Sequence, residues 1–351
     1  MNFASDNTAA VFPSIMQAIV AANQGYAPGY GNDDGTRRVD ARLSALFERE
    51  VAVFLVSTGT VANALALAHL SPPWGAVLCH ADSHINDDES GAPEFFGGGL
   101  KLLEIGGDSA KITPDALTAK LARGRGAPHS VLPSVLSLTQ STELGTVYRN
   151  AEVAALSHIA HAAGLKVHMD GARFANALAT LGGTPAQATW KSGIDVLSFG
   201  ATKGGALAAE AIVFFDPKLA EGMSSRRKRG GALISKHRFI AAQFDAFLRE
   251  DLWLTLARHS NRAAARLAAA LASTNSAPIW PVEANELFVP LSPEANRRLK
   301  AAGADYYIWA ARGVPATVQI PGGHLLARLV MSFDTTDVEV DQFAAIVAAS
   351  G

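Results

Sequence analysis

Short apolar runs alternate with amphipathic stretches over the first two thirds of the chain. The runs indicate buried strands at 51–56, 76–79, 101–105, 135–138, 166–170, 195–199 and 209–215. Helical spacing between them predicts helices at 61–69, from Thr113-Pro114-Asp115 onward, and from Asn150, as the cap, to Ala163. Strands that alternate with helices predict an α/β fold, with a mostly parallel sheet covered on both faces.

The pattern changes in the last third of the chain. From 234 to about 273 it is helical without strands, and 285–292, 293–301, 326–333 and 338–349 then suggest a small α/β unit. We therefore predict a large domain at 1–245, which includes the N-terminal segment, and a smaller C-terminal domain at 246–351. No linker rich in Pro, Gly or Ser marks the boundary.

Composition narrows the class of protein. With 49% hydrophobic and 18% charged residues, the chain is expected to be compact rather than disordered. Its formal net charge of −2 gives no general attraction for nucleic acid or for an anionic membrane, so a small-molecule ligand is expected. The first residues lack the pattern of a signal peptide, and no apolar run is long enough to span a membrane, which predicts a cytoplasmic protein. Cys79, the single cysteine, has no metal-ligand spacing around it, so we expect a buried reduced thiol and no metal.

One acid and one lysine stand at the ends of two predicted strands. Asp170 ends the strand 166–170, and Lys203 follows the strand 195–199 within Ser198-Phe-Gly-Ala-Thr-Lys-Gly-Gly205. Ligands of open α/β sheets bind at the carboxyl ends of the strands. Pyridoxal 5'-phosphate needs a carboxylate at its ring nitrogen and an amine that forms a Schiff base, so the pair predicts this cofactor. Taken singly, Asp170 would be a helix cap and Lys203 a surface lysine.

Other residues gain meaning beside this pair. Thr58-Gly59-Thr60 lies between a strand and a helix, so the amides of the helix start could bind the cofactor phosphate, and Thr202 could add a hydroxyl. A glycine turn with a threonine cap is the alternative. His84 and Glu89 lie in a loop that reaches the same sheet edge. The imidazole could stack on the cofactor ring, although in isolation both would be surface loop residues.

The chain resembles the threonine aldolase family of fold type I pyridoxal phosphate enzymes, in its low-specificity L-threonine aldolase or phenylserine aldolase branch. The resemblance runs nearly end to end. It rests on Phe3-Ala-Ser-Asp6, Tyr30-Gly-Asn-Asp33, Thr58-Gly-Thr-Val-Ala-Asn63, His84 with Glu89, Gly91-Ala-Pro-Glu-Phe-Phe96, His168-Met-Asp-Gly-Ala-Arg173, Gly200-Ala-Thr-Lys203 and Arg328-Leu-Val-Met-Ser-Phe333. It implies an aspartate aminotransferase-like large domain and cleavage of L-threonine, L-allo-threonine or phenylserine-like substrates to glycine and an aldehyde.

The resemblance also implies residue roles. Lys203 would form the Schiff base, Asp170 would pair with the ring nitrogen, and His84 would stack on the ring and accept the hydroxyl proton, directly or through a water held by Glu89 or Glu143. Ser5, Arg173 and Arg328 would bind the substrate carboxylate, for which an arginine fork is well suited.

An active site shared between subunits of a homo-oligomer, a dimer or a homotetramer, is implied as well. Tyr30 and either Lys236 or the basic stretch 226–229 would reach in from a neighbour, whereas the alternative for Arg226 and Arg227 is a solvated helix face.

Two positions depart from the family pattern. Glu143 stands where many members have a second histidine, and the arginine that helps bind the phosphate has no clear counterpart, for which Lys236 is the candidate substitute. Three other classes stay open. These are an aminotransferase or β-eliminating lyase of the same fold, a silent binding protein, and a nicotinamide-dependent dehydrogenase, for which the required G-x-G-x-x-G is lacking after the first strand.

Overall fold

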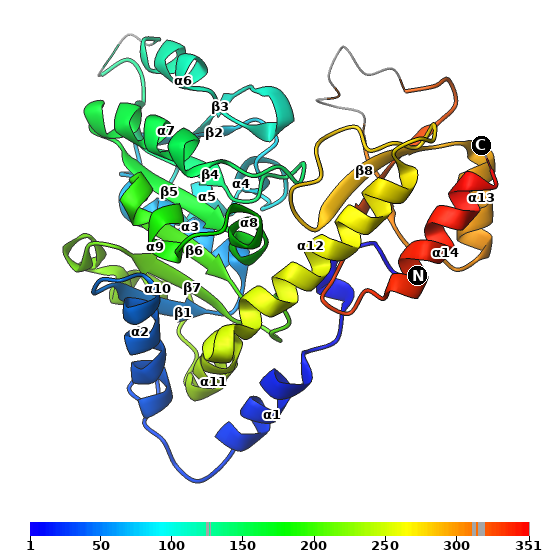
Figure 1. Cartoon of the computed structure of the whole chain (residues 1–351). Coiled ribbons are helices and arrows are strands. Elements are labelled where there is room, and N and C mark those ends of the chain that lie inside the picture. The colour runs from blue at the N-terminus through cyan, green and yellow to red at the C-terminus, as the bar shows by residue number, and fades with distance from the viewer. Residues whose placement is uncertain (124–125, 127, 311–313, 315–319, 351) are drawn as a thin grey trace.

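Two sheets form the framework of the molecule (Figure 1). The structure is a computed structural model that describes residues 1–123, 126, 128–310, 314 and 320–350. The strands of the larger sheet are β1 (Ala52–Val56), β2 (Gly75–His80), β3 (Lys101–Ile105), β4 (Leu132–Thr139), β5 (Lys166–Gly171), β6 (Val196–Gly200) and β7 (Glu210–Phe214). The smaller sheet comprises β8 (Glu286–Leu291), β9 (Tyr307–Ile308) and β10 (Leu325–Val330).

The larger sheet is mostly parallel, as predicted. Its order is β1-β7-β6-β5-β4-β2-β3, and only β7 runs antiparallel to its neighbours, β1 and β6. The loop between β6 and β7 spans residues 201–209 and contains no helix. A parallel connection needs a crossover of a dozen or more residues, so this short loop returns the chain in the opposite direction.

Helices cover both faces of this sheet. Side chains alternate along each strand. In β7, for example, Ala211 and Val213 lie in one apolar core cluster, while Ile212 and Phe214 lie in another. The first cluster is completed by α2, α7, α8 and α11, and the second by α3 and α10. The helices of the described residues are α1 (Pro13–Ala22), α2 (Asp34–Leu46), α3 (Gly59–Leu70), α4 (His84–Asp87), α5 (Ala92–Phe96), α6 (Pro114–Leu121), α7 (Asn150–Ala162), α8 (Phe174–Leu181), α9 (Pro185–Ala188), α10 (Met223–Arg229), α11 (Arg238–Leu248), α12 (Leu252–Leu271), α13 (Pro293–Ala301) and α14 (Asp337–Ala348).

The smaller sheet has its own apolar core. Its strands are antiparallel in the order β8-β10-β9, and α12, α13 and α14 contribute to the core beside them. Phe3 belongs to this core, and its N–H donates to the carbonyl of Asp305. The long helix α12 joins the two units, because Trp253 lies in the large core and Leu267 in the small one (Figure 1). The domain boundary near residue 245 stays a prediction.

One predicted helix cap is wrong. Asn150 is the first residue of α7 rather than its cap, which is Arg149. The Glu152 carboxylate accepts the Arg149 N–H at 2.6 Å, so an acid in the first turn bonds the backbone at the helix start, whereas Asn150 Oδ1 has no hydrogen-bond partner among the described residues. Thr113 is a cap as predicted, because its hydroxyl accepts the N–H of Ala116.

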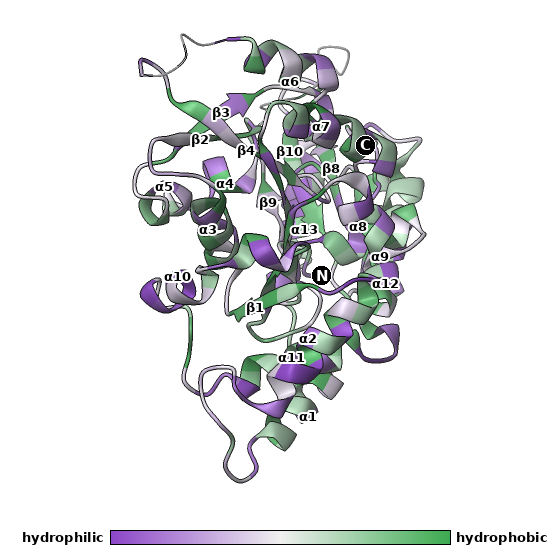
Figure 2. Ribbon diagram, turned by 90° about the vertical axis from the view of Figure 1, so that its left-hand side faces the viewer, coloured by the Kyte–Doolittle hydropathy of each residue, from purple (hydrophilic) through white to green (hydrophobic). Residues whose placement is uncertain are grey.

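Hydropathy follows the layers of the fold. Figure 2 shows β1 as hydrophobic and α10 as mostly hydrophilic, as expected for an edge strand whose side chains pack into the core and for a basic helix. Cys79 is free and buried on β2, as predicted, and burial raises the pKa of its thiol to about 11. Among the described residues, no helix is both long and apolar enough to cross a membrane.

The aromatic cluster around Phe199 generates a stability prediction. Its ring centroid lies 5.5 Å from those of Phe174 and Phe244 and 5.4 Å from that of Trp253, and all four side chains are buried. Phe199→Ala should lower the free energy of unfolding by about 3–5 kcal/mol, because it leaves a cavity in a packed core. Denaturant unfolding of the apoprotein measures this. The control Val338→Ala, at an exposed position, should change the free energy of unfolding by less than about 1 kcal/mol. Equal effects of the two substitutions would contradict the account.

Candidate active site

A cavity of about 370 Å³ opens at the carboxyl-end edge of the large sheet. Its walls come from the segments that follow β1, β4, β5 and β6, and from the start of the antiparallel β7. Most of the predicted site residues line it, namely Thr58, Gly59, Thr60, His84, Glu89, Glu143, Asp170, Arg173, Thr202 and Lys203. The other four predicted residues do not line the cavity. They are Ser5, Tyr30, Lys236 and Arg328.

Asp170 is buried at the end of β5 and fixed by two hydrogen bonds. Its Oδ2 accepts from Asn63 Nδ2 at 2.8 Å, and its Oδ1 accepts the N–H of Ala172 at 3.0 Å. The β5–β6 pairing places Asp170 opposite Ser198, so the strand that carries the acid lies directly beside the strand that leads to the lysine. This arrangement brings the two candidate groups into one cavity.

Lys203 lies in the loop after β6. Burial lowers the pKa of its amine, and the nearby Arg173 guanidinium lowers it further. A lysine with a lowered pKa holds a larger fraction of neutral amine, which is the nucleophilic form that attacks a carbonyl carbon. A lowered pKa is therefore the property that the predicted Schiff-base role of Lys203 requires.

A chain of hydrogen bonds links His84 to Asp170. The Nδ1 of His84 lies 2.9 Å from Glu89 Oε1, and the same oxygen accepts from Asn63 Nδ2, which also donates to Asp170. The hydrogen bond to Glu89 raises the pKa of His84, while burial raises that of Glu89. The resemblance gave Asn63 no role, although it lies in the quoted motif. On α3, it faces both carboxylates.

Glu143 closes the cavity beside His84. Its Oε1 accepts the His84 backbone N–H at 2.9 Å, and burial raises the pKa of its carboxyl to about 7. Its Oε2 is buried and has no hydrogen-bond partner among the described residues. A carboxyl with this pKa can either donate or accept a proton near neutral pH.

The start of α3 lines one end of the cavity, where a phosphate is predicted to bind. The Thr58 hydroxyl caps the helix by accepting the N–H of Val61, so the alternative of a threonine cap holds for this side chain. No partner within the described part of the chain takes the N–H groups of Gly59 and Thr60, which leaves them available to a phosphate. The Thr202 hydroxyl accepts the N–H of Ala209 and is also hydrogen-bonded to the Glu210 carboxyl.

Sequence reasoning missed Glu210, a buried carboxyl at the cavity floor. The start of β7 places it opposite both Val56 of β1 and Gly200 of β6, between the phosphate end and the lysine. Burial raises its pKa to about 7, although hydrogen bonding to Thr202 and the charge of Lys203 act in the other direction. The sequence did offer one signal for this residue: Glu210 is a charged residue in a predicted strand whose other residues are mostly apolar.

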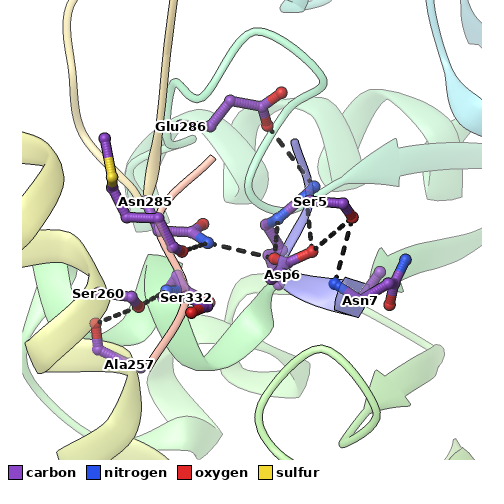
Figure 3. A network of polar contacts seen from close by, with 12 residues as sticks. Ser5, Asp6, Asn7, Ala257, Ser260, Asn285, Glu286 and Ser332 are labelled. Atoms are coloured by element: carbon purple, nitrogen blue, oxygen red, sulfur yellow. Dashed lines mark hydrogen bonds and ion pairs between the residues drawn. The ribbon is translucent and has the colours of Figure 1, made fainter. Parts of the chain in front are cut away.

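Two arginines lie in a network of buried acids next to the cavity. Arg173 donates to Asp6 through Nε at 2.8 Å and through Nη2 at 3.2 Å, and its Nη1 lies 3.5 Å from Glu286 Oε2. Glu286 Oε1 also accepts from Nε of Arg328. Figure 3 shows Asp6 between Ser5 and Asn7 on one side and Asn285 on the other, and Asn285 Nδ2 donates to Asp6 at 3.1 Å.

Charges in this network stabilise each other. Burial alone would lower the pKa of Arg173, but Asp6 and Glu286 raise it. Burial alone would raise the pKa of Asp6, but the charges of Arg173 and Lys203 lower it. Ser5 accepts the N–H of Asn7 and so fixes the short turn that carries Asp6. Thus, Ser5, Arg173 and Arg328 are brought together around acids that the sequence analysis had not assigned.

The residues expected to reach a neighbouring subunit lie away from the cavity. Tyr30 is about half exposed, with the ammonium of Lys228 4.6 Å from its ring centre, and Lys236 is exposed. The alternative of a solvated helix face is wrong for Arg227, which is buried and donates through Nη1 to the carbonyl of Leu55 at 3.2 Å. It ties α10 to β1 instead.

The cavity residues fit pyridoxal phosphate. A fixed buried carboxylate, a buried amine of lowered pKa and the free amides of a helix start occupy one cavity, and the buried Oδ1 of Asn63 awaits a donor. This donor set matches a flat cation-bearing ring with a phosphate. Within the described residues, no group of three or more His, Cys, Asp or Glu side chains could hold a metal ion.

The titration of Glu210 generates a pH prediction. Its pKa rises from an ordinary value of 4.5 to about 7 on folding, so the folded apoprotein holds this proton more tightly than the unfolded chain does. Wild type should therefore lose stability relative to Glu210→Gln as pH rises from about 4.5 to above 7, by about 3 kcal/mol. Unfolding of both apoproteins across this pH range measures it. A difference that does not change with pH would refute the burial argument.

Comparisons with known proteins agree with the predicted fold and with the family that the sequence resembles. The beta-eliminating lyase family matches residues 2–293. The low specificity L-threonine aldolase of Pseudomonas aeruginosa is 42% identical over 96% of this chain and 94% of its own length, and that of another Pseudomonas strain is 40% identical over 99% and 97%. The threonine aldolase structure of Leishmania major superposes with a TM-score of 0.91 at 27% identity, covering 99% of this chain and 98% of that one.

The fold extends to more distant proteins. Serine palmitoyltransferase of Sphingomonas wittichii superposes over all of this chain and 87% of its own, with a TM-score of 0.74 at 16% identity, which supports a common fold alone. The nearly full-length identity to the two Pseudomonas aldolases is more specific. This chain belongs to the beta-eliminating lyase family and, within it, to the threonine aldolases.

Proposed function

We propose that this chain is a pyridoxal phosphate-dependent aldolase that cleaves L-threonine, L-allo-threonine or phenylserine-like β-hydroxy-α-amino acids, reversibly, to glycine and an aldehyde. The observation that carries the proposal is that Asp170 and Lys203 lie in one cavity with the free amides of the α3 start. The relatives of 40–42% identity are low specificity L-threonine aldolases, which supports the reaction type.

Each end of the cavity has its own task. Bound pyridoxal phosphate supplies an electron-withdrawing ring that stabilises negative charge on the substrate Cα. Lys203 would hold the cofactor through its amine. Asp170, fixed by Asn63 and Ala172, keeps a positive charge on the ring nitrogen by accepting its proton in a hydrogen bond. Gly59 and Thr60 bind the phosphate through their N–H groups.

The arginine network orients the substrate. Arg328, assisted by Ser5 and Arg173, binds the substrate carboxylate and thereby fixes rotation about the Cα–N bond. Fixing this rotation would determine which bond at Cα is aligned for cleavage with the electron-withdrawing group that the cofactor supplies. Positioning therefore selects which bond at Cα is broken.

His84 accepts the proton of the substrate hydroxyl. Its Nδ1 is bonded to Glu89, which favours the tautomer with the proton on Nδ1 and leaves the lone pair of Nε2 free. Glu143 lies beside it, fixes the His84 backbone through the N–H bond and can hold a water between hydroxyl and base. Removal of the hydroxyl proton at Nε2 drives cleavage to the aldehyde.

The same proposal includes the assembly and its location. A homotetramer in the cytoplasm, with active sites at subunit interfaces, would bring Tyr30 and Lys236 of one subunit toward the cavity of another. Both side chains are available for this, since Tyr30 is half exposed and Lys236 is exposed. Lys236 would add a positive charge at the phosphate.

Product analysis tests the reaction. Purified protein loaded with pyridoxal phosphate should release glycine and acetaldehyde from L-threonine in equal amounts, and glycine and benzaldehyde from phenylserine. The second candidate, a β-eliminating lyase, is favoured by the name of the matching family and would release ammonia and a keto acid from serine. Keto acid without glycine would replace the aldolase by this candidate, and amino-group transfer to an added keto acid would indicate an aminotransferase.

A pH profile tests the role of His84. Because its pKa is raised above the ordinary value of about 6.5, kcat/KM of wild type should fall as the pH drops through a pKa higher than that, where the base becomes protonated. His84→Phe keeps a ring to stack on the cofactor but should lose about 10²–10⁴-fold in kcat/KM, together with this acid limb. The matched control is His161→Phe, since His161 is equally exposed, at 40%, and is also paired with a carboxylate. Unchanged rate and profile in His84→Phe would eliminate His84 as the base.

A further inference from the structure

We propose that Glu286 is a positioning residue that aims the guanidinium of Arg328 at the substrate carboxylate. The inference rests on the proposed function, because it needs an α-amino acid as substrate. It assigns a role to a buried acid that does not line the cavity but lies beside Arg173, which does. The two arginines differ in which of their guanidinium nitrogens already have an acid beside them.

Glu286 is fixed in place from both sides. It is fully buried as the first residue of β8, where the antiparallel register pairs it with Val330 of β10. Gly145 packs against its backbone, since a Cβ atom at Gly145 would lie only 2.6 Å from the Glu286 carbonyl oxygen. Gly145 has a φ of +75°, so both conformation and space require glycine there. The carboxylate therefore has little freedom to move with its partners.

This carboxylate faces both arginines at once. Its Oε1 accepts from Nε of Arg328, and its Oε2 lies 3.5 Å from Nη1 of Arg173. A carboxylate shared by two guanidinium groups fixes the distance between them as well as their planes. Figure 3 shows Glu286 above the turn that carries Ser5 and Asp6, and thus next to the second acid of the network.

The two arginines are left in different states. Asp6 holds Arg173 by Nε and Nη2, and Glu286 faces the remaining Nη1, so each nitrogen of Arg173 already has an acid beside it. In Arg328, Glu286 accepts from Nε, and among the described residues no group accepts a hydrogen bond from either Nη, so its terminal edge remains free. The Trp309 ring lies 5.3 Å from the Arg328 guanidinium carbon and restricts its tilt. Arg328 is thus the arginine whose two Nη groups remain free, among the described residues, to bind a carboxylate.

Charge balance agrees with this division. The buried network contains two acids, Asp6 and Glu286, and two cations, Arg173 and Arg328, so it is neutral before substrate arrives. A substrate carboxylate then binds through geometry at the free edge of Arg328 rather than through a surplus of positive charge. Position, which Glu286 determines, should matter more for this contact than net charge.

Two explanations of Glu286 predict opposite changes in the affinity for the substrate carboxylate when this acid is neutralised. If the acid positions Arg328, its neutralisation in Glu286→Gln weakens carboxylate binding. If the acid merely competes with the substrate for Arg328, neutralisation removes a repelling charge and strengthens binding. The sign of the change therefore decides between them.

Binding to the holoenzyme measures that sign. Glycine and methylamine, which differ by the carboxylate, are titrated into wild type and Glu286→Gln while the cofactor absorption spectrum is followed. The glycine dissociation constant should rise about tenfold or more in Glu286→Gln, and that of methylamine should stay within about twofold. In turnover, KM for L-threonine should rise more than kcat falls. Unchanged or tighter glycine binding, or equal loss for both amines, would overturn the proposal.

Control variants separate positioning from folding. Asp245→Asn removes another buried acid that contacts Arg42 and Arg249 but lies on α11 outside the cavity, and it should leave both constants unchanged. If Glu286→Gln does not fold, Glu286→Asp decides, because it keeps the charge but is too short to reach both arginines. It should then weaken glycine binding selectively, and wild-type affinity would refute the role. A wild type that binds glycine but releases no aldehyde would instead refute the proposed function.

Discussion

The parallel hydrogen bonding of β5 to β6 is the constraint on which the site depends. The register sets Asp170 against Ser198, so the acid and the segment leading to Lys203 leave the sheet at the same edge. Side chains alternate along a strand, and a slip of one residue would turn Asp170 to the opposite face. The apolar residues of both strands resist such a slip, because Met169 and Leu197 lie in the core that supports them. Packing thus fixes the distance between acid and amine before any ligand binds.

Burial and neighbouring charges then give the carboxyl groups of the site different pKa values. Glu143 and Glu210 lie in surroundings that raise their pKa to about 7, whereas Arg173 lowers that of Asp6. Removal from water disfavours a lone carboxylate, and a nearby guanidinium compensates for that cost. The cavity thereby combines acids that stay ionised, to hold arginines, with acids that can exchange protons near neutral pH. In the proposed reaction, the hydrogen-bonded pair of His84 and Glu89 would act on the substrate hydroxyl.

Sequence patterns predicted the parts of the fold and site that depend on short segments. The strand runs, the Thr113 cap and the approach of Asp170 to Lys203 follow from local periodicity and from the rule that ligands bind at strand ends. The Asn150 cap was wrong because the helix begins at Asn150 itself, with Arg149 as the cap residue and the Glu152 carboxylate bonded to the Arg149 N–H. The position of Arg227 was wrong because a basic stretch does not reveal which of its side chains faces the sheet.

Contacts between distant segments could not be read from the pattern. Asp6 and Arg173 are separated by 167 residues, and Asn285 reaches Asp6 across 279, so no local spacing marks them as partners. Glu210 escaped notice because β7 enters the sheet antiparallel, which brings the start of that strand, rather than its end, to the cavity. The acids and arginines of this network come from segments that are far apart in the chain. Their pairing becomes visible only when the two sheets are placed beside each other in the fold.

Covalent trapping of the cofactor tests the central claim most directly. Borohydride reduction of the protein loaded with pyridoxal phosphate fixes the Schiff base, and peptide mass mapping then identifies the modified lysine. The account predicts a phosphopyridoxyl group on Lys203 in nearly every chain. Modification of Lys236 or of other lysines in its place, with Lys203 left free, would contradict it.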